Sequence, residues 1–297
     1  MSAELTAFAI PEDVDVLDLA RTAREVAVAA GELIIRERPE EIVVTETKSS
    51  RTDVVTAMDQ ASQDLLRSEL LRRRPGDGFA GEERGGAEGT TGITWVVDPI
   101  DGTVNYLYGL AAYAVSVAAV VGDVDAPGGW RPVAAAVVNP VSGEEFGAAL
   151  GRGAWGHTRG GEGGSAPRPL RVAEPESLAM ALCATGFGYA AQRRRWQGRV
   201  IAELLPQVRD IRRLGSAALD LCRVADGTVD VYFERGLNPW DKAAGWLVAT
   251  EAGALVSDLD GGPPSDEMTV AGAPAVQGEL RAALQRAIAQ VGVEQPS

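Results

Sequence analysis

Apolar residues recur at helical spacing in two segments near the start of the chain. In residues 14–37 they lie three or four positions apart between two prolines: Leu17, Ala20, Ala23, Ala27, Ala30 and Ile34. Residues 56–74 carry two pairs of leucines and end at Pro75. This spacing places apolar side chains on one face of a helix, and proline ends a helix. We predict an amphipathic helix in each segment.

Apolar and β-branched segments without helical spacing follow at residues 94–97, 113–121, 133–138 and 145–150. No helical segment separates them, which favours antiparallel strands. After residue 179 the pattern alternates. Predicted strands at 181–185, 210–214, 228–233, 254–257 and 269–271 are interleaved with predicted helices at 192–205, 216–225, 239–251 and 277–289. This half of the chain is expected to form a mixed sheet covered by helices.

The polar, glycine-rich stretch at residues 157–169 is the best candidate for a boundary between halves. It would divide the chain into an N-terminal half, 1–156, and a C-terminal half, 157–297. The stretch is short enough to be a loop within one body, so both a one-domain and a two-domain organisation are compatible with it.

Composition and charge exclude several functions. The 28 basic and 42 acidic side chains give a net charge of −14, which argues against a general binder of polyanions. There is no long apolar run for a membrane span and no export signal, so we expect a cytoplasmic protein. Cys183 and Cys222 lack paired spacing and are expected to be buried thiols. The only histidine, His157, is expected to be a solvated loop residue, which leaves no histidine-dependent catalysis or metal site.

Two further sequence patterns are not predicted to be functional sites. Residues 151–156 match G-x-G-x-x-G, but no helical segment follows, so a dinucleotide site is not predicted. The arginines at 193–195 lie on a predicted helix and are read as a solvated face.

Carboxylates gather where strand segments end. Asp98 and Asp101 lie within WVVDPIDGT, residues 95–103, directly after an apolar run. Burying two unpaired acids together is costly, so a positive partner is needed. The only lysines are Lys48 and Lys242. A hard divalent cation, Mg²⁺ above all, would bind these carboxylates and the carbonyl of Ile100, and arginine is the rival counter-charge.

Three further acids have similar settings. Glu82 and Glu83 follow a short apolar run, Asp241 opens a predicted helix after Asn238, and Asp59 lies early in the second helix. Each motif alone has an ordinary explanation as a turn or a helix cap. Together, and with a short helical pattern that follows Gly102 and would direct its first amides at an anion, they indicate a phosphoryl-transfer site with metal ions.

These residues resemble the inositol monophosphatase family of Mg²⁺-dependent, lithium-sensitive phosphatases. The segments GEE (81–83), WVVDPIDGTVN (95–105), GSAALD (215–220) and WD followed by AAG (240–245) occur in the family's order and spacing. The resemblance covers roughly residues 14–284 and is strongest to bacterial members. It implies an α+β or α/β fold of alternating layers, αβαβα, with an antiparallel N-terminal sheet and a mixed C-terminal sheet, and it implies a homodimer.

The resemblance also implies roles for single residues. Glu82, Asp98 and the Ile100 carbonyl would hold one Mg²⁺, and Asp98, Asp101 and Asp241 a second. A weaker third ion is expected near Glu82, which also counts among the catalytic residues. Thr103, with Asp59 behind it, would orient the attacking water.

Substrate contacts follow in the same way. The resemblance assigns contacts with the phosphate, the sugar alcohol or the partner subunit to Glu82, Ile100, Asp101, Gly102, Thr103, Arg212, Gly215, Ser216, Ala217, Glu234 and Asp241. Lys48 matches a metal-site loop. Asn238 and Pro239 depart from the pattern of animal members, which puts the polyol preference in question.

The expected activity is release of phosphate from myo-inositol 1-phosphate, or a similar polyol or sugar monophosphate, by a metal-activated water. Histidinol phosphate, fructose 1,6-bisphosphate and 3'-phosphoadenosine 5'-phosphate remain alternatives, because related enzymes use the same metal ligands. Glu234 should repel a second phosphate and so favours a monophosphate. The non-enzymatic alternative is association with RNA or RNA polymerase through Arg193–Arg195, Arg212 and Arg213. We expect a phosphate ester as the main partner, with no membrane and no nucleic acid.

Overall fold

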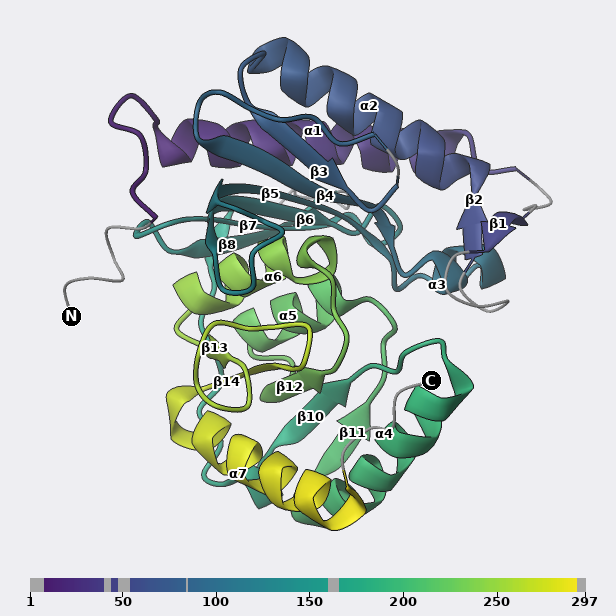
Figure 1. Ribbon diagram of the computed structural model, residues 1–297, viewed down its shortest axis with the longest axis vertical. Helices are drawn as coiled ribbons and strands as arrows, with labels where there is room; N and C mark the ends of the chain where they lie inside the picture. Colours follow the sequence, from purple (N-terminus) through teal and green to yellow (C-terminus); the bar gives the residue numbers. More distant parts are fainter. Residues whose placement is uncertain (1–7, 40–43, 48–53, 84, 160–165, 293–297) are drawn as a thin grey trace.

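Helices and sheets alternate in five layers (Figure 1). The computed structural model describes residues 8–39, 44–47, 54–83, 85–159 and 166–292. Helices α1 (Val16–Arg36) and α2 (Ala57–Arg73) cover one face of the larger sheet. Helices α5 (Ala217–Ala225) and α6 (Pro239–Glu251) lie between the two sheets, and α4 (Ala191–Leu204) and α7 (Pro274–Val291) cover the far face of the smaller one. The predicted αβαβα architecture is confirmed.

Among the described residues, the larger sheet has seven strands in chain order. They are β3 (Gly78–Gly81), β4 (Ile93–Asp101), β5 (Ala114–Gly122), β6 (Trp130–Val138), β7 (Glu144–Ala149), β8 (Ala154–Thr158) and β9 (Arg168–Pro169). All neighbours are antiparallel except β3 and β4, which are parallel. The predicted antiparallel meander is confirmed, and β3, β8 and β9 extend it beyond the strands read from the sequence.

The unbroken apolar run of β5 reflects burial on both faces of this sheet. Val117 and Val121 pack in the hydrophobic cluster under α1 and α2. Ala118 and Val120 pack on the opposite face, in the cluster that contains α5 and α6. Each fully buried valine contributes about 1.5–3 kcal/mol. A strand covered on both sides therefore reads as continuous apolar sequence rather than alternation.

The smaller sheet is mixed, as predicted. Its described strands are β11 (Asp210–Arg212), β10 (Leu182–Thr185), β12 (Val231–Glu234), β14 (Thr269–Gly272) and β13 (Leu255–Ser257), in this order across the sheet. β10 runs parallel to both β11 and β12, whereas β14 is antiparallel to its neighbours. The carboxyl ends of β10, β11 and β12 therefore share one edge, which is where ligands bind in open parallel sheets.

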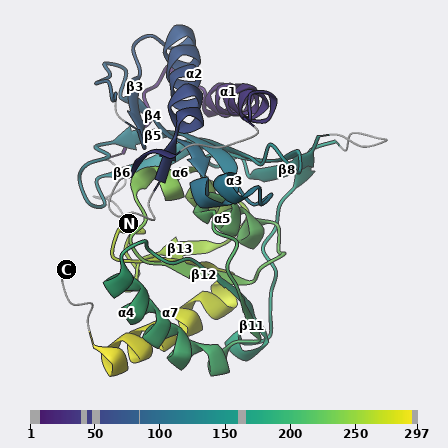
Figure 2. The ribbon, with the colours of Figure 1, turned by 90° about the vertical axis from the view of Figure 1, so that its right-hand side faces the viewer.

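The larger sheet continues through the predicted boundary stretch, and the smaller sheet begins after it, at β10. β8 and β9 pair across residues 157–169, because Trp155 lies opposite Pro169 and Gly156 opposite Arg168. The described residues on either side of 160–165 therefore belong to neighbouring strands of the larger sheet. Helix α6 packs on β4 to β8, and α5 and α6 fill the space between the sheets (Figure 2). The central helical layer is thus shared by both halves.

Smaller elements complete the described chain: β1 (Val44–Thr47), β2 (Val54–Thr56), α3 (Thr103–Tyr108), η1 (Leu178–Met180) and η2 (Leu205–Gln207). Cys183 and Cys222 are free and buried, as predicted. His157 is not the solvated loop residue that its glycine-rich surroundings suggested. It lies on β8 with its side chain 15% exposed and Nδ1 3.8 Å from Oε2 of Glu145. None of the helices in the described ranges is long and apolar enough to cross a membrane.

Candidate active site

Asp98 and Asp101 lie at the irregular end of β4. Asp98 is opposite Ser116 of β5 and Asp101 is opposite Ala114, so β4 carries one extra residue between them. A bulge of this kind redirects side chains and tolerates a proline in a strand. The N–H of Ile100 donates to Asp98 Oδ1 at 3.0 Å, and both aspartates are buried. The turn-like bond considered from the sequence is present, but it lies inside the molecule.

Gly102 turns the chain from β4 into α3. Its φ is +98°, and a Cβ at this position would lie 3.0 Å from the carbonyl oxygens of both Ala112 and Gly215. Only glycine combines this backbone conformation with such a close approach. The turn places Thr103, the first residue of α3, in the same cavity as the aspartates of β4.

Thr103 and Asp59 form the pair expected from the resemblance. Thr103 Oγ1 lies 3.2 Å from Asp59 Oδ1 and 3.1 Å from the carbonyl oxygen of Ile100, so its single proton can be donated to either. Asp59 is the third residue of α2, and its Oδ2 accepts bonds from the N–H and hydroxyl of the N-cap residue Thr56 at 2.7 and 2.5 Å. Burial raises the pKa of Asp59 to about 6, against the lowering effect of the Thr56 bonds.

Glu82 and Glu83 separate in the structure. Glu82 lines the cavity, and its N–H donates to the carbonyl of Val97 on β4 at 3.2 Å. Glu83 is buried against α2, where its Oε2 accepts from Gln60 Nε2 at 3.0 Å and its N–H donates to Gln63 Oε1 at 2.8 Å. The chain bends directly after β3, and of the two glutamates only Glu82 lines the cavity.

Asp241 is both a helix cap and a cavity residue. It is the third residue of α6, and its Oδ2 accepts from the N–H of Asn238 at 2.7 Å. The capping interpretation of this motif is therefore correct, and the same carboxylate also lines the cavity. Pro239 occupies the first turn, where its missing N–H costs no hydrogen bond.

These acids converge on one cavity of about 430 Å³. The residues around its acidic end are Glu82, Asp98, Ile100, Asp101, Gly102, Thr103 and Asp241. Burial raises the pKa of Asp98 well above its ordinary value, and the charges of Glu82, Asp101 and Asp241 raise it further. The pKa of Asp241 is raised in the same way, by burial and then by Glu82 and Asp101. Four carboxylates from three distant segments thus lie within electrostatic reach of one another.

The chemistry of this cluster fits a hard cation. Its donors are all oxygens, the ligands that Mg²⁺ prefers. Among the described residues, no arginine forms an ion pair with Asp98, Asp101 or Asp241, so the rival counter-charge is not found at these three. Lys242 turns away: its buried Nζ donates to the carbonyl of Leu237 at 2.9 Å. In the described ranges, however, no three acidic, histidine or cysteine side chains are already closed around a common point.

The carboxylates are not closed around one point because that of Asp101 faces the start of α5. Oδ2 accepts from Ser216 Oγ at 2.6 Å and from the N–H of Ala218 at 2.7 Å, and Oδ1 accepts from the N–H of Ala217 at 3.3 Å. Burial raises the pKa of Asp101 to about 6, although these bonds oppose the shift. A negative charge at a helix N-terminus is favourable. The position of α5 therefore sets the position of this acid.

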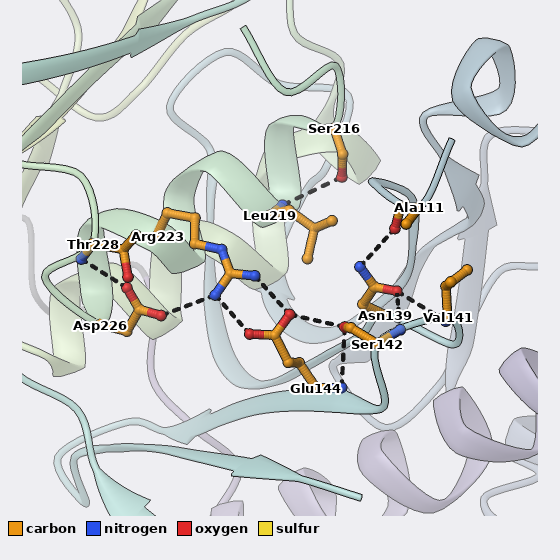
Figure 3. A network of polar contacts seen from close by, with 10 residues as sticks. All are labelled: Ala111, Asn139, Val141, Ser142, Glu144, Ser216, Leu219, Arg223, Asp226 and Thr228. Carbon is orange, nitrogen blue, oxygen red and sulfur yellow. Dashed lines mark hydrogen bonds and ion pairs between the residues drawn. The ribbon is translucent and has the colours of Figure 1, made fainter. Parts of the chain in front are cut away.

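The other end of α5 is fixed to the larger sheet (Figure 3). Arg223 makes two bonds to Glu144 of β7, Nη1 to Oε1 at 2.8 Å and Nη2 to Oε2 at 2.6 Å, and Nη1 also bonds Asp226 at 3.0 Å. The Arg223 bonds lower the pKa of Glu144. Such two-pronged pairs restrict geometry as well as adding energy. The pair holds the helix that presents its first amides to Asp101.

The predicted substrate contacts divide into two groups. Gly215, Ala217 and Glu234 line the cavity. Ser216 is buried and its hydroxyl is bound to Asp101, so it does not face the cavity. Arg212 is also outside: its Nη1 pairs with Asp210 Oδ2 at 2.6 Å and half of its side chain is exposed. Lys48 lies outside the described residues.

Several residues of this region were not foreseen as site residues, and three of them are charged side chains of particular interest. Arg213, which directly follows β11, lines the cavity, whereas Arg212, the last residue of β11, does not. Arg193 also lines it, so the reading of residues 193–195 as a solvated face holds only for Arg194 and Arg195. Asp220 of α5 is buried, and in the part of the chain that the structure describes neither of its carboxylate oxygens has a hydrogen-bond partner. Burial raises the pKa of Asp220 well above its ordinary value.

Comparisons with known sequences agree with this geometry. The family model described as "Inositol monophosphatase family" matches residues 15–292. "Inositol-1-monophosphatase SuhB" of Mycobacterium tuberculosis is 47% identical over 247 residues, 80% of each chain. "Nus factor SuhB" of Xylella fastidiosa is 36% identical over 269 residues, which are 89% of this chain and 92% of the relative.

Solved structures show the same fold. Mycobacterium tuberculosis SuhB superposes with a TM-score of 0.75 at 40% identity, covering 93% of this chain and 98% of that one. Thermotoga maritima IMPase superposes with a TM-score of 0.77 at 26% identity, covering 93% and 100%. The likeness therefore extends over both sheets and the helices between them.

Proposed function

Because the chain belongs to the inositol monophosphatase family of phosphatases, we propose that it is a Mg²⁺-dependent hydrolase of myo-inositol 1-phosphate or a similar polyol or sugar monophosphate. One observation carries the proposal. Glu82, Asp98, Asp101 and Asp241, from segments far apart in the sequence, gather in one cavity beside the Thr103–Asp59 pair.

The acids would hold the cations. Glu82, Asp98, Asp101, Asp241 and the carbonyl of Ile100 are the oxygen donors, and two or three Mg²⁺ ions are proposed. A bound divalent cation polarises water and phosphate oxygens and offsets the charge that develops on the leaving alcohol. Such ions would also offset the burial and the mutual repulsion that raise the pKa values of Asp98 and Asp241.

The protein's own groups would position the reactants. Thr103 donates its proton to Asp59 Oδ1 or the Ile100 carbonyl, so its oxygen can accept a hydrogen bond and orient a water beside the phosphate. Glu82, on the same cavity wall, can accept a proton from that water. Gly102 and Thr103 would receive the phosphate.

Glu234 suits the hydroxyl groups of a polyol. It lines the cavity, and its Oε2 accepts from the hydroxyl of Tyr232 at 2.7 Å. Burial raises the pKa of Glu234 to about 7, while the Tyr232 bond and the charge of Arg213 lower it. A carboxyl in this state can donate as well as accept a hydrogen bond.

Phosphate release from a panel of esters tests the proposal. We expect turnover of myo-inositol 1-phosphate with Mg²⁺ and none in the presence of a chelator. Histidinol phosphate, fructose 1,6-bisphosphate and 3'-phosphoadenosine 5'-phosphate should be slower. If none of the four esters releases phosphate with Mg²⁺, the proposed activity is wrong.

Replacing Thr103 with alanine should separate catalysis from metal binding. The hydroxyl orients water but is not among the proposed metal ligands, so we expect kcat to fall by about 10²-fold or more. The Mg²⁺ concentration for half-maximal activity should stay within about twofold, and Thr103→Ser should restore most of the rate. A large shift in the Mg²⁺ requirement of Thr103→Ala would contradict this role.

A role through association has less support. The name "Nus factor SuhB" belongs to the Xylella fastidiosa relative. In this chain, the role through association is suggested only by the arginines at 193–195, 212 and 213. Of these, Arg212 is paired with Asp210 and Arg193 lines the cavity. Salt-dependent RNA binding that survives Glu82→Gln would favour association.

A further inference from the structure

Helix α2 buries polar side chains where it passes the active site. Its buried face begins with Asp59, Ser62 and Gln63 and continues with Leu66 and Leu70. Residues three or four positions apart lie on one face of a helix. Burying a polar side chain costs free energy unless it is hydrogen-bonded. The first half of this face therefore serves specific polar contacts rather than core packing.

The three polar side chains contact three different segments of the site. The hydrogen bonds run from the hydroxyl of Thr103 to the carboxylate of Asp59 (3.2 Å), from the hydroxyl of Ser62 to the carbonyl of Pro99 (3.2 Å), and from the N–H of Glu83 to the side-chain oxygen of Gln63 (2.8 Å). One face of α2 thus meets the start of α3, the bulge of β4 and the segment that follows β3.

The bond to Gln63 fixes the backbone around Glu82. The N–H of Glu82 donates to the carbonyl of Val97 on β4 at 3.2 Å, and the next N–H, that of Glu83, donates to Gln63. These two N–H groups belong to the peptide planes on either side of the Glu82 Cα. Because peptide planes are rigid, φ and ψ of Glu82 are the only soft dihedrals between them. The direction of the Glu82 carboxylate therefore depends on both bonds.

Gly81 leaves the space that the side-chain amide of Gln63 occupies. A Cβ on Gly81 would lie 2.6 Å from Cδ of Gln63, so any larger residue would displace the amide. Unlike Gly102, Gly81 has no positive φ, and the reason for a glycine here is space rather than backbone conformation. Gln63 is 3% exposed, so water does not compete for the bond.

We propose that Gln63 is a positioning residue of the metal site, which holds the backbone of Glu82 so that its carboxylate faces the cavity. The inference rests on the proposed Mg²⁺-dependent function, because Gln63 would act only through a metal ligand. Removing a partner that orients a metal ligand typically lowers metal affinity by roughly 10–100-fold. Helix α2 would then support the metal site through Gln63 and the water-orienting pair through Asp59.

Binding of Mg²⁺ alone to the full chain, measured by titration calorimetry, tests this role. Gln63→Met keeps an unbranched side chain but has no strong acceptor for the Glu83 N–H, and we expect its Kd for Mg²⁺ to be about tenfold higher than that of the parent. Gln63→Glu retains an accepting oxygen and should stay within about threefold. Gln60→Met is the matched control: Gln60 lies on the same helix and bonds the carboxylate of Glu83, not its backbone, so the Kd should not change.

Glu82→Gln shows whether Gln63 acts through Glu82. If it does, Gln63→Met should raise the Kd about tenfold in the parent and less than about twofold in the Glu82→Gln background. An equal factor in both backgrounds would show a general effect on the structure and would overturn the positioning role. A parent-like Kd of Gln63→Met would overturn it as well.

Gly81→Ala reaches the same bond from the other side, because its Cβ would take the place of the Gln63 amide. It should also raise the Kd by about tenfold. The melting temperature in a chelator identifies the variants that fold, and if Gln63→Met does not, a parent-like Kd of Gly81→Ala overturns the role. A parent protein that binds no Mg²⁺ would instead refute the proposed metal-dependent function, and the role of Gln63 with it.

Discussion

Replacing Asp98 with asparagine should lower kcat by about 10³-fold or more. Asp98 is 2% exposed, and the charges of Glu82, Asp101 and Asp241 act on it more strongly than any other group. It is the one acid proposed to ligate two cations, so its loss weakens both sites at once. Several kcal/mol of charge stabilisation in the transition state corresponds to a rate factor of this size.

The same substitution should not destabilise the metal-free protein. Asparagine keeps the size of the side chain and can still accept the bond from the Ile100 N–H. It also removes one of four mutually repelling carboxylates. We therefore expect the melting temperature in a chelator to be equal to or higher than that of the parent, as measured by calorimetry. Asp125→Asn, in the exposed turn between β5 and β6, is the matched control and should retain full activity. Parent-like turnover by the Asp98 variant would refute the assignment of the metal site.

Mg²⁺ should stabilise the protein, and more strongly at about pH 8 than at about pH 5.5. Burial raises the pKa of Asp101 from 3.8 to about 6, and the pKa values of Asp98 and Asp241 rise well above their ordinary value. A carboxyl with a higher pKa in the folded state binds its proton more tightly there. Its contribution to the free energy of unfolding is fully present below about pH 4 and is lost as the pH rises through 6 and beyond. The metal-free protein should therefore lose stability over this range.

A bound cation replaces those protons. At a Mg²⁺ concentration a hundred times the dissociation constant, the gain is about 2.7 kcal/mol, which raises the melting temperature by roughly 5 °C or more. The measurement compares melting temperatures with Mg²⁺ and with a chelator at both pH values. Asp98→Asn should lose most of the Mg²⁺-dependent rise. An equal rise at the two pH values would show that the raised carboxyl pKa values are not linked to metal binding.

The elements that repeat a local pattern could be predicted from the sequence. The helical spacing of α1 and the apolar runs of β4, β5 and β6 are properties of neighbouring residues, and the structure confirms them within a few residues. β3 and β8 were missed because they are short and contain glycine, and only a neighbouring strand identifies them as strands. The pairing of β8 with β9 could not be predicted for the same reason, since the pairing partner of a short strand is not visible in its own composition.

Sequence alone determined which acids are chemically unusual. Asp98, Asp101 and Asp241 stand at breaks enforced by proline and glycine, and the two lysines of the chain, Lys48 and Lys242, are too few to balance the gathered carboxylates. Only the tertiary structure decided which side chains share the cavity. It placed Arg213 there instead of Arg212, separated Arg193 from its solvated neighbours, and turned Asp101 toward α5. Local sequence sets the backbone conformation and the alternation of side chains along a strand. Which side chain meets a distant loop depends instead on how the two sheets pack around α5 and α6.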